Sequence, residues 1–136
     1  MKIGIISDTH QGRITEDFKR ALTSLFGNVD TIIHAGDMTA ADVYEFLCNW
    51  DIRAVRGNMD DFELRRVLPE KRVEEIMGIR IGIMHGRGSP YGLDDLVFNE
   101  FQNVDVIIFG HSHTPLYTKN GNTQLFNPGT YRSTSF

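Results

Sequence analysis

The sequence predicts an α/β protein in which a parallel sheet is followed by strands that pair as hairpins. Three observations support this class. Up to residue 55, short apolar runs alternate with segments of helical spacing, which is the order that builds a parallel sheet. Beyond residue 70, two pairs of apolar runs are joined by the tight-turn sequences Met77-Gly78 and Asn120-Gly121-Asn122. With 136 residues, 40% of them apolar and 24% charged, the chain is expected to be one domain spanning residues 1–136.

The first half is expected to contain three strands and two helices. Short apolar runs predict the strands over residues 2–7, 30–34 and 52–55. Apolar positions three and four residues apart predict a helix over residues 15–26. Thr39 is expected to be the N-cap of a second helix that runs to about residue 49.

The second half is expected to add a hairpin, a helix, a buried strand and a second hairpin. These elements are predicted over residues 72–84, 92–101, 104–109 and 116–126, in that order. The charged run over residues 70–75 is expected to be a solvated face of the first of these strands.

Composition argues against several classes of protein. A formal net charge of −4 disfavours a surface for duplex nucleic acid, which would favour a basic face. No apolar run approaches the ~18 residues that a membrane helix needs, so no membrane association is expected. The single cysteine, Cys48, excludes a disulfide framework and is expected to be a small buried hydrophobe on a helix. These features predict a cytoplasmic protein.

Two histidines follow the most apolar strand. The run over residues 106–109 ends at Gly110, and His111 and His113 come next with one residue between them. Residues two apart in an extended chain point the same way, so both imidazoles are expected to reach one space beyond the strand end. Open α/β sheets bind ligands at that end. Two imidazoles favour a transition metal over calcium or magnesium alone.

The same pattern follows four other apolar runs, and four of the five histidines take part in it. The candidate ligands are Asp8, His10, Asp37, Asn58, His85, His111 and His113. This set is too large for one metal and suits two metals that share a carboxylate. Two divalent ions and two carboxylates leave a surplus of about two positive charges, which predicts hydrolysis of a phosphate ester.

The ligand motifs resemble those of a known family. D-T-H, G-D, G-N, H-G and G-H-S-H occur here in the order found in the calcineurin-like metallophosphoesterase family. The nearest resemblance is to its small bacterial and archaeal phosphodiesterase branch, to which the retromer scaffold subunit is related. The match runs from Ile3 to Gly129. It implies a four-layer α/β/β/α sandwich of two mixed β-sheets flanked by helices, and a phosphodiesterase reaction in which a metal-bridging hydroxide attacks phosphorus.

By motif position, the resemblance implies two metal sites bridged by Asp37. The first ion would be held by Asp8, His10 and His113. The second ion would be held by Asn58, His85 and His111. Relatives usually work with manganese, iron, zinc or nickel, and two divalent ions are expected here, manganese before the others.

The chain departs from the family pattern at two places. Many relatives carry a histidine after G-N that protonates the leaving group, whereas this chain has Met59 and then Asp60. Asp60 is expected to support the ligands or to handle protons, and activated diesters are expected to react better than alkyl monoesters.

Relatives also continue with further strands after the segment that corresponds to residues 127–130. An uncovered sheet edge is therefore expected, which favours a homodimer or larger homo-oligomer.

The residues predicted to act in catalysis are Asp37, Asn58, Asp60 and His85. Arg87, in the glycine-rich loop after His85, and Arg13 are predicted to bind the substrate phosphate, and Arg56 is a further candidate. His34 lies within a strand and is expected to be structural rather than a ligand.

Two other functions remain open beside a phosphodiesterase of small substrates. The fold could serve as a protein-binding scaffold, as in the retromer subunit, but the seven intact ligand positions favour an enzyme. A nuclease or cyclic-nucleotide phosphodiesterase is the second alternative. The acidic balance and the lack of clustered basic and aromatic residues restrict it to short or cyclic nucleotides.

Overall fold

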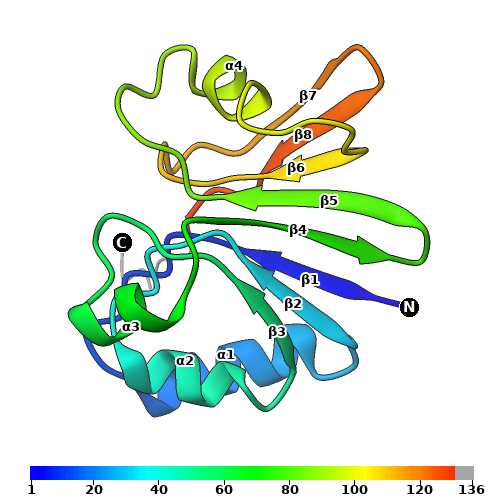
Figure 1. Cartoon of the computed structure of the whole chain (residues 1–136). Helices are drawn as coiled ribbons and strands as arrows, with labels where there is room; N and C mark the ends of the chain where they lie inside the picture. Colours follow the sequence, from blue (N-terminus) through cyan, green and yellow to red (C-terminus); the bar gives the residue numbers. More distant parts are fainter. Residues whose placement is uncertain (131–136) are drawn as a thin grey trace.

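The computed structural model describes residues 1–130 and arranges them as two β-sheets with helices on their outer faces (Figure 1). The first sheet has the order β1-β2-β3, with β1 at Ile3–Ile6, β2 at Thr31–His34 and β3 at Asp51–Ala54. Its strands pair in parallel throughout. The parallel sheet predicted for the first half is therefore confirmed.

The second sheet has five strands in the order β4-β5-β6-β8-β7. Its strands are β4 (Lys71–Ile76), β5 (Ile79–Met84), β6 (Val106–Ile108), β7 (Leu116–Asn120) and β8 (Thr123–Asn127). The two predicted hairpins are confirmed, because β4 pairs antiparallel with β5 and β7 with β8. Strand β6 pairs in parallel with both β5 and β8. Of the two sheets within residues 1–130, the second is thus the mixed one.

Four helices are described: α1 (Glu16–Phe26), α2 (Ala41–Leu47), α3 (Phe62–Val67) and α4 (Leu93–Phe98). Helices α1 to α3 lie on the first-sheet side of the molecule and α4 on the second-sheet side (Figure 1). Helix α1 begins as predicted, with the Thr15 side chain accepting a hydrogen bond from the Phe18 amide. Within residues 1–130, no helix has the length and apolar character needed to cross a membrane.

The start of α2 differs from the prediction. The helix follows Ala40, which forms no side-chain cap. Thr39 instead adopts a left-handed backbone with φ of 76°, and its hydroxyl donates to the Gln11 carbonyl at 2.5 Å. Thr39 therefore joins two loops rather than capping the helix.

Helix α3 was not predicted from the sequence. It is six residues long and buries one side chain, Leu64, so its apolar positions are too few to show a helical period. Its start is nevertheless capped, because the Asp61 carboxylate accepts a hydrogen bond from the Leu64 amide at 2.9 Å.

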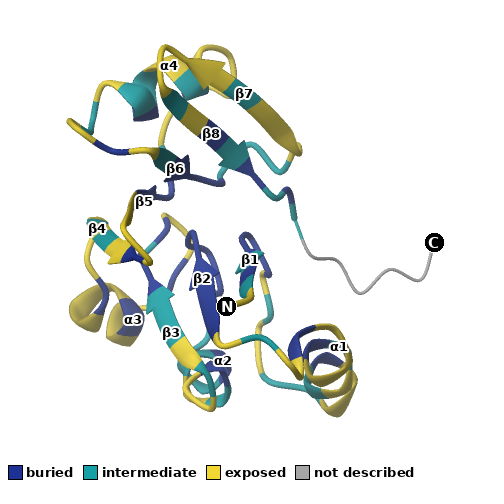
Figure 2. Ribbon diagram, turned by 90° about the vertical axis from the view of Figure 1, so that its right-hand side faces the viewer, coloured by how far each residue is buried: buried dark blue, intermediate teal, exposed yellow. Residues whose placement is uncertain are grey.

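Three apolar layers hold the four layers of secondary structure together. Neighbouring residues of a strand contribute to different layers, since their side chains point to opposite faces. In β2, Ile32 packs with the buried faces of α1 and α2, whereas Ile33 packs between the two sheets. In β6, Ile108 packs between the sheets and Ile107 packs against α4. Figure 2 shows these buried strands between exposed outer surfaces, and the four-layer sandwich is confirmed.

One expectation about burial was wrong, and a second holds only in part. Cys48 is exposed, because α2 ends at Leu47 and the cysteine caps its last turn outside the apolar face. The charged run 70–75 is not a solvated face throughout. Glu74 is half-buried and accepts hydrogen bonds from Arg72 at 2.7 Å and from Arg53 of β3 at 2.8 Å.

Candidate metal centre

The candidate ligands come from both sheets and meet at one edge of the sandwich. They follow the ends of β1, β2, β3, β5 and β6 and are, in that order, Asp8 and His10, Asp37, Asn58, His85, and His111 with His113. The carboxyl ends of parallel strands lie at the same edge of a sheet, so the sequence pattern translates into proximity.

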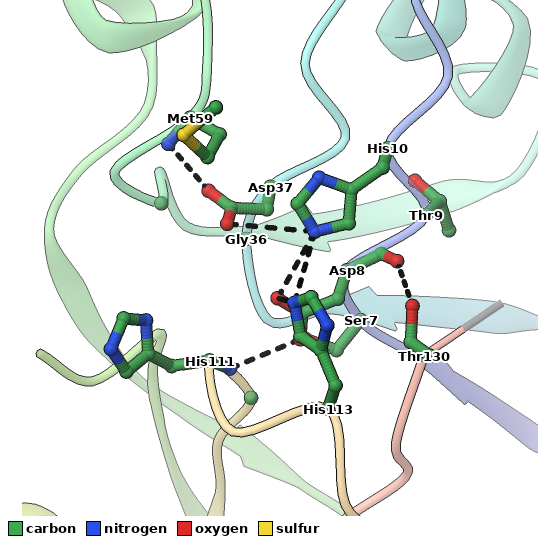
Figure 3. Close-up of polar contacts among 12 residues, drawn as sticks. Ser7, Asp8, Thr9, His10, Gly36, Asp37, Met59, His111, His113 and Thr130 are labelled. Atoms are coloured by element: carbon green, nitrogen blue, oxygen red, sulfur yellow. Dashed lines mark hydrogen bonds and ion pairs between the residues drawn. The ribbon is translucent and has the colours of Figure 1, made fainter. Parts of the chain in front are cut away.

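Asp8, His10 and His113 form one group, in which the ligand atoms lie within 4.8 Å of one another. Asp8 Oδ1 is 3.6 Å from His10 Nε2 and 3.3 Å from His113 Nε2. The two imidazole nitrogens are themselves 3.1 Å apart. Figure 3 shows both rings directed at the Asp8 carboxylate.

Asp8, Asp37 and His85 form a second group that shares Asp8 with the first. His85 Nε2 lies 3.2 Å from Asp37 Oδ2 and 3.7 Å from Asp8 Oδ1. The amide oxygen of Asn58 is 3.1 Å from the same His85 nitrogen. Asp37 Oδ2 is also 3.8 Å from His10 Nε2, so this carboxylate lies between the two groups.

The buried carboxylate of Asp8 fits a cation. Its Oδ2 accepts hydrogen bonds from the Ser7 hydroxyl at 2.5 Å and from the His111 amide at 3.0 Å. Its Oδ1 is buried and has no hydrogen-bond partner within residues 1–130, a costly arrangement for an anionic oxygen. A positive ion among these donor atoms would remove that cost.

His85 is oriented with Nε2 toward the site. Its Nδ1 lies 2.7 Å from the Ala35 carbonyl, which can only accept, so Nδ1 carries a proton and Nε2 is the nitrogen that would bind an ion. Burial lowers the pKa of His85, but the hydrogen bond and charge of Asp37 outweigh it and leave that pKa above its ordinary value. Burial raises the pKa of Asp37, but His85 and the Met59 amide bring it below its ordinary value.

His111 is not brought into either group. Its amide donates to Asp8, but its imidazole is turned away from the His10 and His113 rings (Figure 3). The ring Nε2 lies 2.8 Å from the Gly88 carbonyl, which leaves Nδ1 as the nitrogen with a lone pair. The ring packs edge-on against His85, with centroids 5.2 Å apart. Its role as a ligand therefore remains a prediction.

The loops that carry the ligands have strained backbones. Within residues 1–130, eight non-glycine residues have positive φ, and five of them are candidate ligands: Asp8 (53°), His10 (46°), Asp37 (61°), His111 (70°) and His113 (64°). Such conformations are costly for residues with a Cβ and gather where function requires them.

Two glycines allow the loops to approach one another. A Cβ on Gly57 would lie 2.1 Å from Asp37 Oδ1, and one on Gly110 would lie 1.9 Å from the Ser7 hydroxyl. The glycines of the G-N and G-H motifs are thus required because any side chain there would clash with a neighbouring loop, and not because of a turn conformation.

Asp60 lies behind the ligands and organises their backbone. Its Oδ2 accepts hydrogen bonds from the amides of Gly57 at 2.7 Å and Asp37 at 3.2 Å, and its Oδ1 from the amide of Thr39 at 2.7 Å. Burial raises the pKa of this carboxyl above its ordinary value, although the Gly57 and Thr39 amides favour the charged form. With both oxygens occupied, the geometry favours the supporting role over proton transfer.

Asn127 is a supporting residue that the sequence interpretation missed. Its buried amide donates to the Gly110 carbonyl at 3.0 Å and to the Ser112 hydroxyl at 3.1 Å. Asn127 therefore holds the loop that carries His111 and His113. The signal was the N-P-G-T motif, whose asparagine is the final residue of β8. Thr130 of the same motif donates to the Asp8 carbonyl (Figure 3).

His34 is fully buried and lies outside both ligand groups. Its Nδ1 accepts the Gly36 amide at 3.1 Å, so its Nε2 carries the proton and donates to the Thr9 hydroxyl at 3.0 Å. Burial, with the nearby charge of His85, lowers the pKa of His34 to about 3. A neutral histidine that joins the Asp8 and Asp37 loops agrees with the structural role expected for it.

The two arginines predicted to bind substrate lie in different places. Arg87 lines a cavity of about 270 Å³ beside Asn58 and His85, together with Arg56. Arg13 is exposed in the loop between β1 and α1 and does not line that cavity. Its predicted role remains untested.

A cluster of aspartates and histidines at the strand ends of an α/β/β/α sandwich defines the metallophosphoesterase class of fold. Residues 1–136 match the calcineurin-like phosphoesterase superfamily domain, and the chain belongs to this family. It is 38% identical over 135 residues to a probable metallophosphoesterase of Methanocaldococcus jannaschii, covering 95% of this chain and 67% of the relative.

Solved structures agree with this family. One is described as a novel archaeal phosphodiesterase, with a TM-score of 0.74, 27% identity, and 96% of this chain and 84% of that chain covered. Another is Vps29 from Entamoeba histolytica complexed with zinc, with a TM-score of 0.71, 25% identity, and 96% and 77% covered.

Proposed function

We propose that the protein is a phosphodiesterase that works with two divalent metal ions on a small phosphodiester in the cytoplasm. The observation that carries the proposal is the pair of overlapping ligand groups around Asp8, which share a buried oxygen without a hydrogen-bond partner. Membership of a phosphoesterase family and likeness to an archaeal phosphodiesterase support the reaction class.

The described side chains divide between two ions. Asp8, His10 and His113 would hold one ion, and Asn58, His85 and His111 the other, His111 through its Nδ1, with Asp37 contributing to both. When bound, divalent ions lower the pKa of water and offset the charge of a phosphate ester. Neutral imidazoles preserve the positive surplus that an anionic substrate needs, and the Ala35 carbonyl holds His85 in the required tautomer. Manganese is the proposed metal, and the zinc complex of the Entamoeba protein makes zinc the first alternative.

The surroundings of Asn58 favour substrates with good leaving groups. Met59 follows it, with its amide on Asp37 Oδ1 at 2.7 Å, and both oxygens of Asp60 are occupied by backbone amides. Neither residue is placed to protonate a poor leaving group. We therefore expect aryl diesters to be hydrolysed well and alkyl monoesters poorly.

The first test is hydrolysis of bis(p-nitrophenyl) phosphate and p-nitrophenyl phosphate by metal-free protein and after addition of manganese, nickel or zinc. The diester should be turned over with metal, and Asp37→Asn and His85→Ala should each lower kcat/KM by about 1,000-fold, since each removes a metal ligand. Asp95→Asn, on the exposed side of α4, is the matched control and should retain wild-type turnover.

A scaffold is the second candidate, favoured by the likeness to Vps29 in fold. The same experiment separates the two functions. Two bound ions per chain without turnover of either ester would contradict the enzyme and favour a protein-binding role.

A further inference from the structure

We propose that the cavity beside the metal centre binds a second phosphate group of the substrate, so that the preferred substrates are diesters that carry an additional phosphomonoester. The inference rests on the proposed phosphodiesterase function and names its substrate class. The cavity has a volume of about 270 Å³ and is lined by Arg56, Arg65 and Arg87, with Glu70 as the one carboxylate among its lining residues. Three guanidiniums against one carboxylate leave a surplus of positive charge among the lining residues, which suits a phosphate group.

The three arginines come from separate segments of the chain. Arg56 follows β3, Arg65 lies in the last turn of α3, and Arg87 follows β5. The three positions are 9 and 22 residues apart in the sequence, yet each places an arginine at the same cavity. Arginines that only kept a surface solvated would not need to converge in this way. Guanidinium groups bind phosphate oxygens through paired hydrogen bonds.

Two of these guanidiniums are not paired with a carboxylate. Arg56 is half-buried, and its Nη1 donates a hydrogen bond to the Leu68 carbonyl at 3.1 Å, which anchors the side chain without neutralising its charge. Within residues 1–130, neither Arg56 nor Arg65 forms an ion pair. Arg87 contacts Glu100 at 3.4 Å, an exposed pair of the kind that contributes little and can exchange partners.

The cavity opens onto the metal centre. Asn58 and His85 line it and contact each other at 3.1 Å, and His85 belongs to the second ligand group. A phosphodiester held at the ligands would therefore have one substituent beside the arginines. A phosphate on that substituent would carry two negative charges, whereas a neutral substituent would leave the guanidiniums without a partner.

A matched pair of chromogenic esters tests this assignment. The first is thymidine 5′-(p-nitrophenyl phosphate), and the second is the same ester with an added 3′-phosphate; both release p-nitrophenol from the same bond. We expect kcat/KM with manganese to be about tenfold higher for the second ester, the size of effect that a charged hydrogen bond supports. Arg65→Met should bring the ratio of the two values close to one.

Arg66→Met is the matched control, because Arg66 neighbours Arg65 on α3 but packs over the Phe62 ring at 5.8 Å and does not line the cavity. It removes the same charge and should preserve the ratio. Arg56→Met should also lower the ratio, and the exposed Arg65 keeps the test valid if loss of the Leu68 contact impairs folding.

Binding to metal-free protein separates failure of the inference from failure of the proposed function. Calorimetry should show that thymidine 3′,5′-bisphosphate binds at least about tenfold more tightly than thymidine 5′-phosphate, and that Arg65→Met removes the difference. Hydrolysis of both esters with equal kcat/KM would overturn the inference and leave the phosphodiesterase. A retained binding difference without hydrolysis of either ester would uphold the cavity and overturn the phosphodiesterase. Loss of both results would overturn both.

Discussion

The Asp8 carboxylate is the single residue whose environment points most directly to a metal site. One oxygen is held by the Ser7 hydroxyl and the His111 amide, while the other is buried among imidazoles without a hydrogen bond. Its backbone is also left-handed, with φ of 53°. A protein bears such a desolvated and strained group when another interaction offsets its cost, and a bound metal ion would supply that interaction.

Asp60 is expected to position the metal ligands and not to bind a metal ion itself. Asp60→Asn replaces one acceptor by an amide group that faces backbone N–H donors. We expect it to lower the free energy of unfolding by about 3 kcal/mol and to weaken manganese binding by at least about tenfold, because the Asp37 loop loses its anchor. Urea unfolding and calorimetric titration measure the two effects.

Asp61→Asn is the neighbouring control, since asparagine is an equally good N-cap for α3. It should leave both quantities close to wild type. If Asp60→Asn bound manganese as tightly as the wild-type protein, Asp60 would not position the ligands.

Short elements depend on their ends, and α3 is the clearest case. It has six residues and one buried side chain, so its capping hydrogen bond is a large part of what holds it. We expect Asp61→Ala to lower the free energy of unfolding by about 1 kcal/mol, measured by urea denaturation. Because α3 carries Arg65, the same variant should reduce the preference for the ester with the added phosphate.

Asp61→Ser should restore stability, because a hydroxyl can accept the same bond from the Leu64 amide. Equal stability of the alanine and serine variants would mean that packing of Leu64, and not the cap, sets the start of α3.

In the whole molecule, the candidate ligands come from both sheets, which also meet through apolar packing and through the hydrogen bond from Arg53 of β3 to Glu74 of β4. Asp8 and Asp37 follow strands of the first sheet, and His85 and His113 follow strands of the second. Ions bound between them would hold both sheets in one cooperative unit. Strand β1 pairs with β2 alone within residues 1–130, and the predicted self-association through a sheet edge remains a prediction.

We expect manganese at a hundred times its Kd to raise the free energy of unfolding by about 2.7 kcal/mol for one bound ion, with a single unfolding transition. Addition of a chelator should reverse the shift, and Asp37→Asn should reduce it. Thermal unfolding followed by calorimetry checks this. An unchanged transition in the presence of bound manganese would show that the ions do not link the sheets.

Much of the architecture was readable from the sequence because it depends on local pattern. Apolar runs, helical spacing and turn residues predicted the parallel first sheet, both hairpins and the strand-end position of every candidate ligand. Thr39 and Cys48 were misplaced because a helix start and a helix end are decided within one or two residues. Helix α3 was missed because Leu64 alone cannot show a period.

The sequence by itself determined which residues stand at the carboxyl ends of the strands, and therefore the chemistry that the chain offers. Only the tertiary structure decided how those residues meet: Asp8 shared between two groups, His111 turned aside, Asp60 and Asn127 behind the ligands, and Arg65 beside Arg56. The physical reason is that the position of each strand in the sequence and the direction of its side chains follow from the local apolar pattern. Contacts between loops instead depend on how two sheets pack against each other, a property of the whole chain.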